Sequence, residues 1–159
     1  MTNKQHYRAC TFGRFNLFHN GHLLLIKRMQ ALADYVTIGL STGPKNLPFE
    51  LRKEVIDLAL LGQAIPYSVV EAAHPFDLFD QVKGKRNDDV IAIFGADQSR
   101  LGLCAEKHYG WASGVVERIT SSTALRVAID EEDWDLVAHL TCPGTATHLV
   151  NLRKLELTN

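Results

Sequence analysis

Short apolar runs alternate along this chain with longer stretches in which apolar residues recur every three or four positions. The apolar runs predict five strands, at residues 7–10, 35–40, 65–70, 89–95 and 113–118. The longer stretches predict helices at residues 23–33, 50–61 and 98–108, and a short helix after His74. From Ser122 onward the pattern predicts two or three short helices, broken at Pro143-Gly144. The apolar stripe of the 50–61 helix is expected to be Leu51, Val55, Leu58 and Ala59.

This alternation of strands and helices predicts an α/β fold. We expect a doubly wound, Rossmann-like parallel five-stranded sheet with short C-terminal helices, formed by a single domain over residues 1–159. In such a sheet, ligands bind beyond the carboxyl ends of the strands. The polar loops that follow strands are therefore expected at one edge of the sheet, and they lie at residues 13–14, 41–42, 95–97 and 119–122.

Composition narrows the classes of partner. The 159 residues are 46% hydrophobic, which suits a compact domain with a core. Lys and Arg number 17 against 18 acidic residues, so no basic surface for nucleic acid is expected. The three cysteines, Cys10, Cys104 and Cys142, lack metal-type spacing and are read as buried fillers in a reducing cytoplasm. The sequence shows neither a secretory leader nor an apolar run that could span a bilayer, so no membrane partner is expected.

The most informative stretch covers residues 11–22, between the first strand and the first helix. It contains His19-Asn20-Gly21-His22, which places two imidazoles three positions apart where the helix should begin. Gly13 allows the backbone to bend, and Gly21 allows a ligand to approach without meeting a Cβ. Because the first amides of a helix lack partners and face its positive dipole end, this stretch predicts an anion site.

The phrase Gly13-Arg14-Phe15, followed by His19-Asn20-Gly21-His22, resembles the nucleotidyltransferase superfamily. It looks most like the archaeal-type nicotinamide mononucleotide adenylyltransferases, although Asn16-Leu17 stands where that family often has Gln-Pro. The resemblance implies adenylyl transfer from ATP with Mg²⁺, in which an acceptor phosphate attacks the α-phosphorus and pyrophosphate leaves. Such chemistry needs positioning and charge stabilisation but no covalent enzyme intermediate. Catalytic roles are implied for His19 and His22, and nucleotide-binding roles for Gly13, Arg14, Phe15 and Gly21.

A second signature lies about a hundred residues downstream, over residues 119–126. It resembles the superfamily's Ile-Ser-x-Thr/Ser-x-x-Arg segment, which holds the β- and γ-phosphates. Ser121 or Ser122 can cap the following helix, and the free amides there suit phosphates. Nucleotide binding is implied for Ser121, Ser122 and Thr123, and a catalytic role for Arg126, whose guanidinium can fork onto phosphate oxygens.

Two further segments resemble the superfamily. Gly95 ends the 89–95 strand and Asp97 follows it. The resemblance implies that both contact the ribose and adenine, while Asp97 can equally cap a helix. The loop after the second strand supplies candidate acceptor contacts at Ser41, Lys45 and Arg52, although charged residues of this kind are often merely solvated. Trp134 lies in a region that is mainly structural in the family.

The leading hypothesis is an enzyme that joins ATP and nicotinamide mononucleotide to give NAD and pyrophosphate. Alternatives keep the chemistry and change the acceptor, as in phosphopantetheine adenylyltransferases or cytidylyltransferases, or lose it, as in a nucleotide-binding sensor. Phe15, Phe18 and Trp111 are candidate surfaces for a pyridine ring, with packing the favoured role for Trp111. The resemblance also implies a homo-oligomer.

Overall fold

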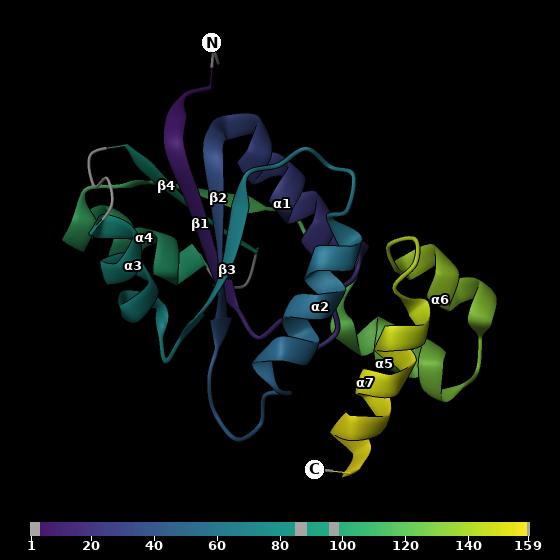
Figure 1. The fold of residues 1–159 in the computed structure, drawn as a ribbon. Coiled ribbons are helices and arrows are strands. Elements are labelled where there is room, and N and C mark those ends of the chain that lie inside the picture. Colours follow the sequence, from purple (N-terminus) through teal and green to yellow (C-terminus); the bar gives the residue numbers. More distant parts are fainter. Residues whose placement is uncertain (1–3, 85–88, 96–98, 159) are drawn as a thin grey trace. The chain divides into compact units, whose positions relative to one another are not determined.

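The computed structural model describes residues 4–84, 89–95 and 99–158 of the chain. It contains the expected parallel sheet of five strands, in the order β3-β2-β1-β4-β5 (Figure 1). The strands are β1 (His6–Gly13), β2 (Ala33–Ser41), β3 (Tyr67–Ala72), β4 (Val90–Gly95) and β5 (Ala112–Val116). The predicted α/β fold class, a Rossmann-like doubly wound sheet, is therefore confirmed.

The helices alternate with the strands and then follow one another at the C-terminus. They are α1 (Asn20–Leu32), α2 (Phe49–Ala59), α3 (Pro75–Lys83), α4 (Ser99–Tyr109), α5 (Ser122–Asp130), α6 (Trp134–Leu140) and α7 (Ala146–Thr158). The third strand begins two residues later than predicted, at Tyr67, because Pro66 has no amide hydrogen for the ladder. The Pro66 carbonyl still accepts a hydrogen bond from the amide of Val36.

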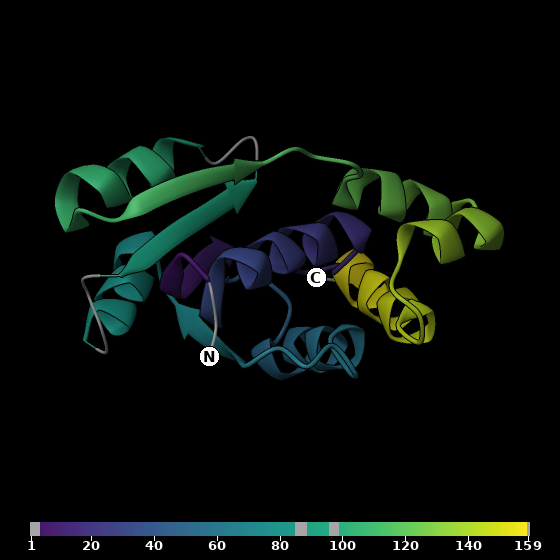
Figure 2. The same cartoon turned by 90° about the horizontal axis from the view of Figure 1, so that it is seen from above.

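The described chain forms two compact units. The first comprises Met1–Arg14, Leu24–Thr42 and Ile65–Glu117, and the second comprises Phe15–Leu23, Gly43–Ala64 and Arg118–Asn159. The first unit holds the whole sheet, and α3 and α4 cover one of its faces while the α1 residues of this unit lie on the other (Figures 1 and 2). The second unit holds α2, α5, α6, α7 and the first turn of α1. The single domain expected over residues 1–159 stays a prediction.

The first unit is built on an apolar cluster between the sheet and helices α3 and α4. Phe79 of α3 meets Trp111 edge to face at 5.3 Å between ring centroids, and only 3% of Trp111 is exposed. Packing is therefore the role of Trp111, as expected. Cys10 lies in the same cluster, and burial raises the pKa of its thiol to about 12, so this thiol is inert at neutral pH.

The topology reverses between β1 and β4. The chain runs outward from β1 through β2 to β3 and returns to β4 on the other side of β1. A parallel sheet offers its ligand site at the carboxyl ends of the two strands where this happens. Those ends are Gly13 of β1 and Gly95 of β4, and Ser41 ends β2 beside them. Three of the predicted site residues therefore gather at this edge of the first unit.

Helix α2 of the second unit corrects one prediction. Its buried residues are Arg52, Val55, Ile56 and Ala59, whereas Leu51 and Leu58 are only half-buried. The buried set follows the helical spacing i, i+3, i+4, i+7, but a charged residue occupies its first position. The expected stripe is confirmed at Val55 and Ala59 and wrong at Leu51 and Leu58. The neighbouring face, which begins at Leu51, looks more apolar in the sequence.

Candidate active site

Two histidine rings lie stacked at the start of α1, in the second unit. The centroids of His19 and His22 are 3.8 Å apart, and their ring planes differ by 17°. Only 4% of His19 is exposed, and His22 is half-buried. The side chains meet because His19 immediately precedes the helix and His22 lies in its first turn.

Backbone amides determine which ring nitrogens carry hydrogen. The amide of Gly21 donates to His19 Nδ1 at 3.0 Å, and the amide of His19 donates to His22 Nδ1 at 3.2 Å. A ring nitrogen that accepts a hydrogen bond carries no proton, so in each neutral imidazole the hydrogen is on Nε2. The motif therefore offers two Nε2–H donors.

Both rings are held neutral. Burial, followed by the charges of Arg118 and Arg126, lowers the pKa of His19 from 6.5 to about 4. Burial, followed by His19 and Arg118, lowers the pKa of His22 well below its ordinary value. At neutral pH the pair therefore donates hydrogen bonds without carrying charge, while two cations supply positive potential beside it.

Gly21 is required by the position of the His19 ring. A Cβ at this residue would lie 2.8 Å from His19 Cε1 and 3.0 Å from Nδ1. The same Cβ would lie 3.4 Å from the carbonyl oxygen of Thr120, so the loop before α5 runs against this turn. The two signature segments, far apart in the sequence, are thus in contact within the second unit.

The rings of Phe15 and Phe18 pack against the ring of His22. Their ring centroids lie 4.7 Å and 5.3 Å from the His22 ring. Phe15 and Phe18 are only 6% and 1% exposed, so both rings support the histidine rather than offer a face to a pyridine ring. Phe15 also has a positive φ of 49°, which is strained for a bulky residue and costs about 1–3 kcal/mol.

Asn16 makes a buried contact with the loop between β2 and α2. Its buried side-chain Oδ1 accepts a hydrogen bond from the amide of Leu47 at 3.0 Å. This bond ties the loop that carries Lys45 to the histidine motif, and both belong to the second unit. Lys45 is exposed, whereas Arg52 is only 3% exposed, which rules out a solvated Arg52.

The start of α5 has the expected cap. Ser121 Oγ accepts a hydrogen bond from the amide of Ala124 at 3.1 Å, which confirms Ser121 rather than Ser122 as the N-cap. The amides of Ser122 and Thr123, next in the helix, make no hydrogen bond to any residue that the structure describes. Two donors at the positive end of a helix therefore remain for an anion.

Arg126 is paired with a carboxylate of α7. Its Nε and Nη2 donate to the two carboxylate oxygens of Glu156, at 2.9 Å and 2.7 Å. The expected contact of Arg126 with phosphate oxygens stays a prediction. The sequence did not predict Glu156 as a partner, because Glu156 lies 30 residues after Arg126. It also did not predict Arg118, whose charge contributes to lowering the pKa of both histidines.

The remaining predicted residues lie in the first unit or outside the described ranges. Gly13, Ser41 and Gly95 end their strands, and the exposed Arg14 directly follows β1. Asp97 lies outside the described residues.

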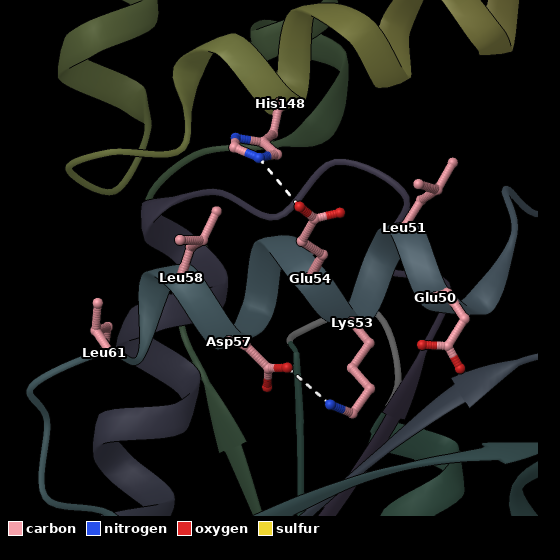
Figure 3. Close-up of a pocket in the computed structure, with 8 residues that line it drawn as sticks. All are labelled: Glu50, Leu51, Lys53, Glu54, Asp57, Leu58, Leu61 and His148. Carbon is pink, nitrogen blue, oxygen red and sulfur yellow. Dashed lines mark hydrogen bonds and ion pairs between the residues drawn. The ribbon is translucent and has the colours of Figure 1, made fainter.

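A surface pocket of about 520 Å³ lies beside α2 (Figure 3). Glu54 of α2 points toward His148 of α7, with 3.3 Å between the paired atoms, and Lys53 pairs with Asp57 at 2.7 Å. The other lining residues are Glu50, Leu51, Leu58 and Leu61. None of the predicted site residues lines this pocket, so it is distinct from the candidate active site.

In residues 4–84, 89–95 and 99–158, no group of three or more His, Cys, Asp and Glu side chains is placed to hold a metal ion. Within the same ranges, none of the helices combines the length and apolar character that a bilayer crossing requires.

The sequence is similar to a family of known proteins and to individual enzymes. Residues 10–113 match the cytidylyltransferase-like family. Glycerol-3-phosphate cytidylyltransferase of Bacillus spizizenii is 34% identical over 96 residues, which cover 49% of this chain and 74% of that protein. Pantothenate synthetase of Cereibacter sphaeroides is 27% identical over 152 residues, which cover 87% of this chain. This chain spans about half of the synthetase, since the match covers 53% of it.

Solved structures share the fold over nearly the whole chain. A bifunctional NMN adenylyltransferase/ADP ribose pyrophosphatase from Francisella tularensis matches with a TM-score of 0.74 and 18% identity, over 96% of this chain and 53% of that one. Nicotinic acid mononucleotide adenylyltransferase of Plasmodium falciparum matches with a TM-score of 0.68 and 13% identity, over 97% and 99% of the two chains. The family match spans more than half of the sequence. The chain therefore belongs to the cytidylyltransferase-like family and is a nucleotidyltransferase.

Proposed function

We propose that this protein transfers AMP from ATP to nicotinamide mononucleotide, giving NAD and pyrophosphate. The observation that carries the proposal is the neutral histidine pair, whose Nδ1 atoms accept from backbone amides and whose Nε2–H groups are left as donors. Two observations support this acceptor. The phrase Gly13-Arg14-Phe15 precedes the histidine pair in the sequence. The fold is also shared, over nearly the whole chain, with two pyridine mononucleotide adenylyltransferases.

The reaction is a displacement at phosphorus. A phosphate oxygen of the acceptor forms a bond to the α-phosphorus of ATP, and the bond from that phosphorus to the β-bridging oxygen breaks. The bridging oxygen keeps the electron pair and leaves with pyrophosphate. Negative charge builds on the equatorial oxygens in the transition state, and the Nε2–H groups of His19 and His22 stabilise it there.

The other groups bind and position the substrates. The amides of Ser122 and Thr123 and the cation of Arg126 receive the β- and γ-phosphates, while Ser121 fixes the helix start. Gly13, Arg14, Phe15, Gly21, Gly95 and Asp97 are assigned to the nucleotide, and Ser41, Lys45 and Arg52 to the acceptor. Mg²⁺ enters bound to ATP, because it prefers phosphate oxygens and water as ligands.

A second candidate is cytidylyl transfer from CTP to a phosphorylated alcohol. The observation that favours it is the 34% identity over 96 residues to a glycerol-3-phosphate cytidylyltransferase. The same displacement at phosphorus serves both reactions, so the histidine pair does not separate them. The two reactions differ in the base of the nucleotide and in the acceptor.

The test combines each of two nucleotides with each of three acceptors. Purified protein is incubated with Mg²⁺, ATP or CTP, and nicotinamide mononucleotide, phosphopantetheine or glycerol 3-phosphate, and pyrophosphate release is followed. We expect pyrophosphate and NAD with ATP and nicotinamide mononucleotide, and a preference for ATP over CTP. Pyrophosphate only with CTP and glycerol 3-phosphate would replace the first candidate with the second. Pyrophosphate only with ATP and phosphopantetheine would overturn both.

A further inference from the structure

Arg126 is held from one side by a carboxylate that the proposed reaction does not use. Glu156 of α7 accepts from Arg126 Nε at 2.9 Å and from Nη2 at 2.7 Å. The Glu156 side chain is 13% exposed and that of Arg126 is 30% exposed, so this pair is shielded more than an ordinary surface pair. A bidentate bond of this kind fixes both the position and the plane of the guanidinium.

Glu156 is itself held in place. Its Oε1 also accepts from Arg153 Nη1 at 3.3 Å, and Arg153 donates from Nε and Nη2 to Asp130 at 2.9 Å and 2.6 Å. Asp130 ends α5, and Arg153 and Glu156 lie one turn apart on α7. A chain of ion pairs therefore runs from the end of α5 through α7 and back to Arg126 in α5, all within the second unit.

This bonding leaves one end of the guanidinium for a ligand. The edge formed by Nε and Nη2 faces Glu156, and Nη1 makes no hydrogen bond to any residue in the described part of the chain. While Arg126 is bonded to Glu156, its charge is one of the causes that lower the pKa of His19, after burial and the charge of Arg118.

We propose that Glu156 is the positioning residue for Arg126: it holds the Nε–Nη2 edge of the guanidinium and so presents Nη1 as the donor to a phosphate oxygen of ATP. This inference rests on the proposed function and refines it. Arg126 then makes a single, oriented contact to the triphosphate in place of a fork. The orientation is set before ATP binds, so binding does not have to order a long flexible side chain.

The opposite role for Glu156 makes the opposite prediction. If Glu156 were a competitor that ATP must displace, its removal would strengthen ATP binding. If it positions Arg126, its removal weakens ATP binding, because the guanidinium then samples many orientations. Glu156→Gln keeps the size of the side chain and removes its charge, so it separates the two roles.

The experiment measures binding and turnover separately. Binding of a non-hydrolysable ATP analogue is followed by calorimetry, and the KM for ATP and kcat are taken from pyrophosphate release. We expect Glu156→Gln to weaken binding and raise KM about tenfold, the scale of one charge-assisted hydrogen bond, with little change in kcat. Glu54→Gln is the matched control, because Glu54 also pairs with a side chain of α7 but lies outside the ion-pair chain.

A double-mutant cycle shows whether Glu156 acts through Arg126. We expect Arg126→Ala and the double variant to bind the analogue equally weakly, since nothing is left for Glu156 to position. Unchanged or tighter binding by Glu156→Gln, or an additive loss in the double variant, overturns the inference. Wild-type protein that binds the analogue but releases no pyrophosphate with any acceptor would contradict the proposed function alone, because the binding cycle still reports on Glu156.

Discussion

At the scale of single residues, two backbone amides give the site its chemistry. Nδ1 of His19 and Nδ1 of His22 each accept a hydrogen bond from a backbone amide. The hydrogen of each neutral ring is therefore on Nε2. These Nε2–H groups can donate to a phosphate near neutral pH while both rings stay neutral.

Removing one donor should slow the reaction strongly. We expect His22→Ala to lower kcat about 10²–10³-fold, because loss of one positioned donor to a charged transition state costs about 2.7–4 kcal/mol in other enzymes. Pyrophosphate release measures the rate, and circular dichroism shows whether the variant is folded. His139→Ala, an exposed histidine of α6, is the control and should keep the wild-type rate. A folded His22→Ala variant with normal turnover would exclude the proposed role.

Stability should fall in mild acid because of His19. Its pKa is lowered from 6.5 to about 4 in the folded state, so below pH 6.5 the unfolded chain takes up a proton that the folded chain refuses. Between pH 7.5 and 5 this one group should reduce the free energy of unfolding by about 2 kcal/mol. Above pH 7.5 it contributes nothing, because both states are neutral.

Urea unfolding at pH 7.5 and at pH 5 checks this prediction. The difference between the two free energies should shrink by about 2 kcal/mol in His19→Gln, since glutamine does not titrate. His139→Gln should keep the wild-type difference. An unchanged difference in His19→Gln would mean that the His19 pKa is ordinary.

At the scale of elements, the start of α5 joins stability to nucleotide binding. Ser121 caps α5 through the amide of Ala124, and Asp133 caps α6 through the amide of Leu136 at 3.3 Å. The two caps belong to the same unit and satisfy equivalent backbone groups, but only the first precedes the proposed phosphate site. They therefore form a matched pair for mutation.

Loss of either cap should lower the free energy of unfolding by a similar amount, but only loss of the Ser121 cap should weaken the use of ATP. We expect Ser121→Ala and Asp133→Ala each to lower the free energy of unfolding by about 1 kcal/mol. Only Ser121→Ala should also raise the KM for ATP, because its helix start receives the phosphates. Denaturant unfolding and pyrophosphate kinetics measure the two effects. An equal rise in KM for Asp133→Ala would show that the effect is general loosening of the second unit.

Local patterns predicted the elements well and their partners poorly. The strand and helix alternation, the Ser121 cap and the histidine pair each depend on residues that are close in sequence, and sequence analysis anticipated them. The Glu156 partner of Arg126 and the Leu47 partner of Asn16 lie 30 and 31 residues away, where spacing carries no information. Arg52 was named as a candidate acceptor contact, but its burial was not predicted, because a charged residue interrupts an otherwise regular apolar face.

At the scale of the whole molecule, one fold can serve different nucleotides and acceptors. The α/β framework fixes where the strands end, and the choice of base and acceptor depends on the side chains of the site.

Ligand-induced stabilisation tests the nucleotide preference on the intact protein. A ligand that binds only the folded state at 100 times its Kd raises the free energy of unfolding by about 2.7 kcal/mol. At equal concentrations with Mg²⁺, we expect ATP to raise the Tm more than CTP does. Thermal unfolding measures both shifts, and GTP serves as a comparison for unspecific triphosphate binding. A larger shift with CTP would favour the cytidylyl candidate.

The close approach of Gly21 to the His19 ring also has a consequence for the gene. Every other amino acid brings a Cβ, and at this residue the Cβ would come within 2.8 Å of a ring carbon. No missense change in codon 21 therefore leaves the imidazole where it is. In a library of all single substitutions selected for activity, codon 21 should retain only synonymous changes.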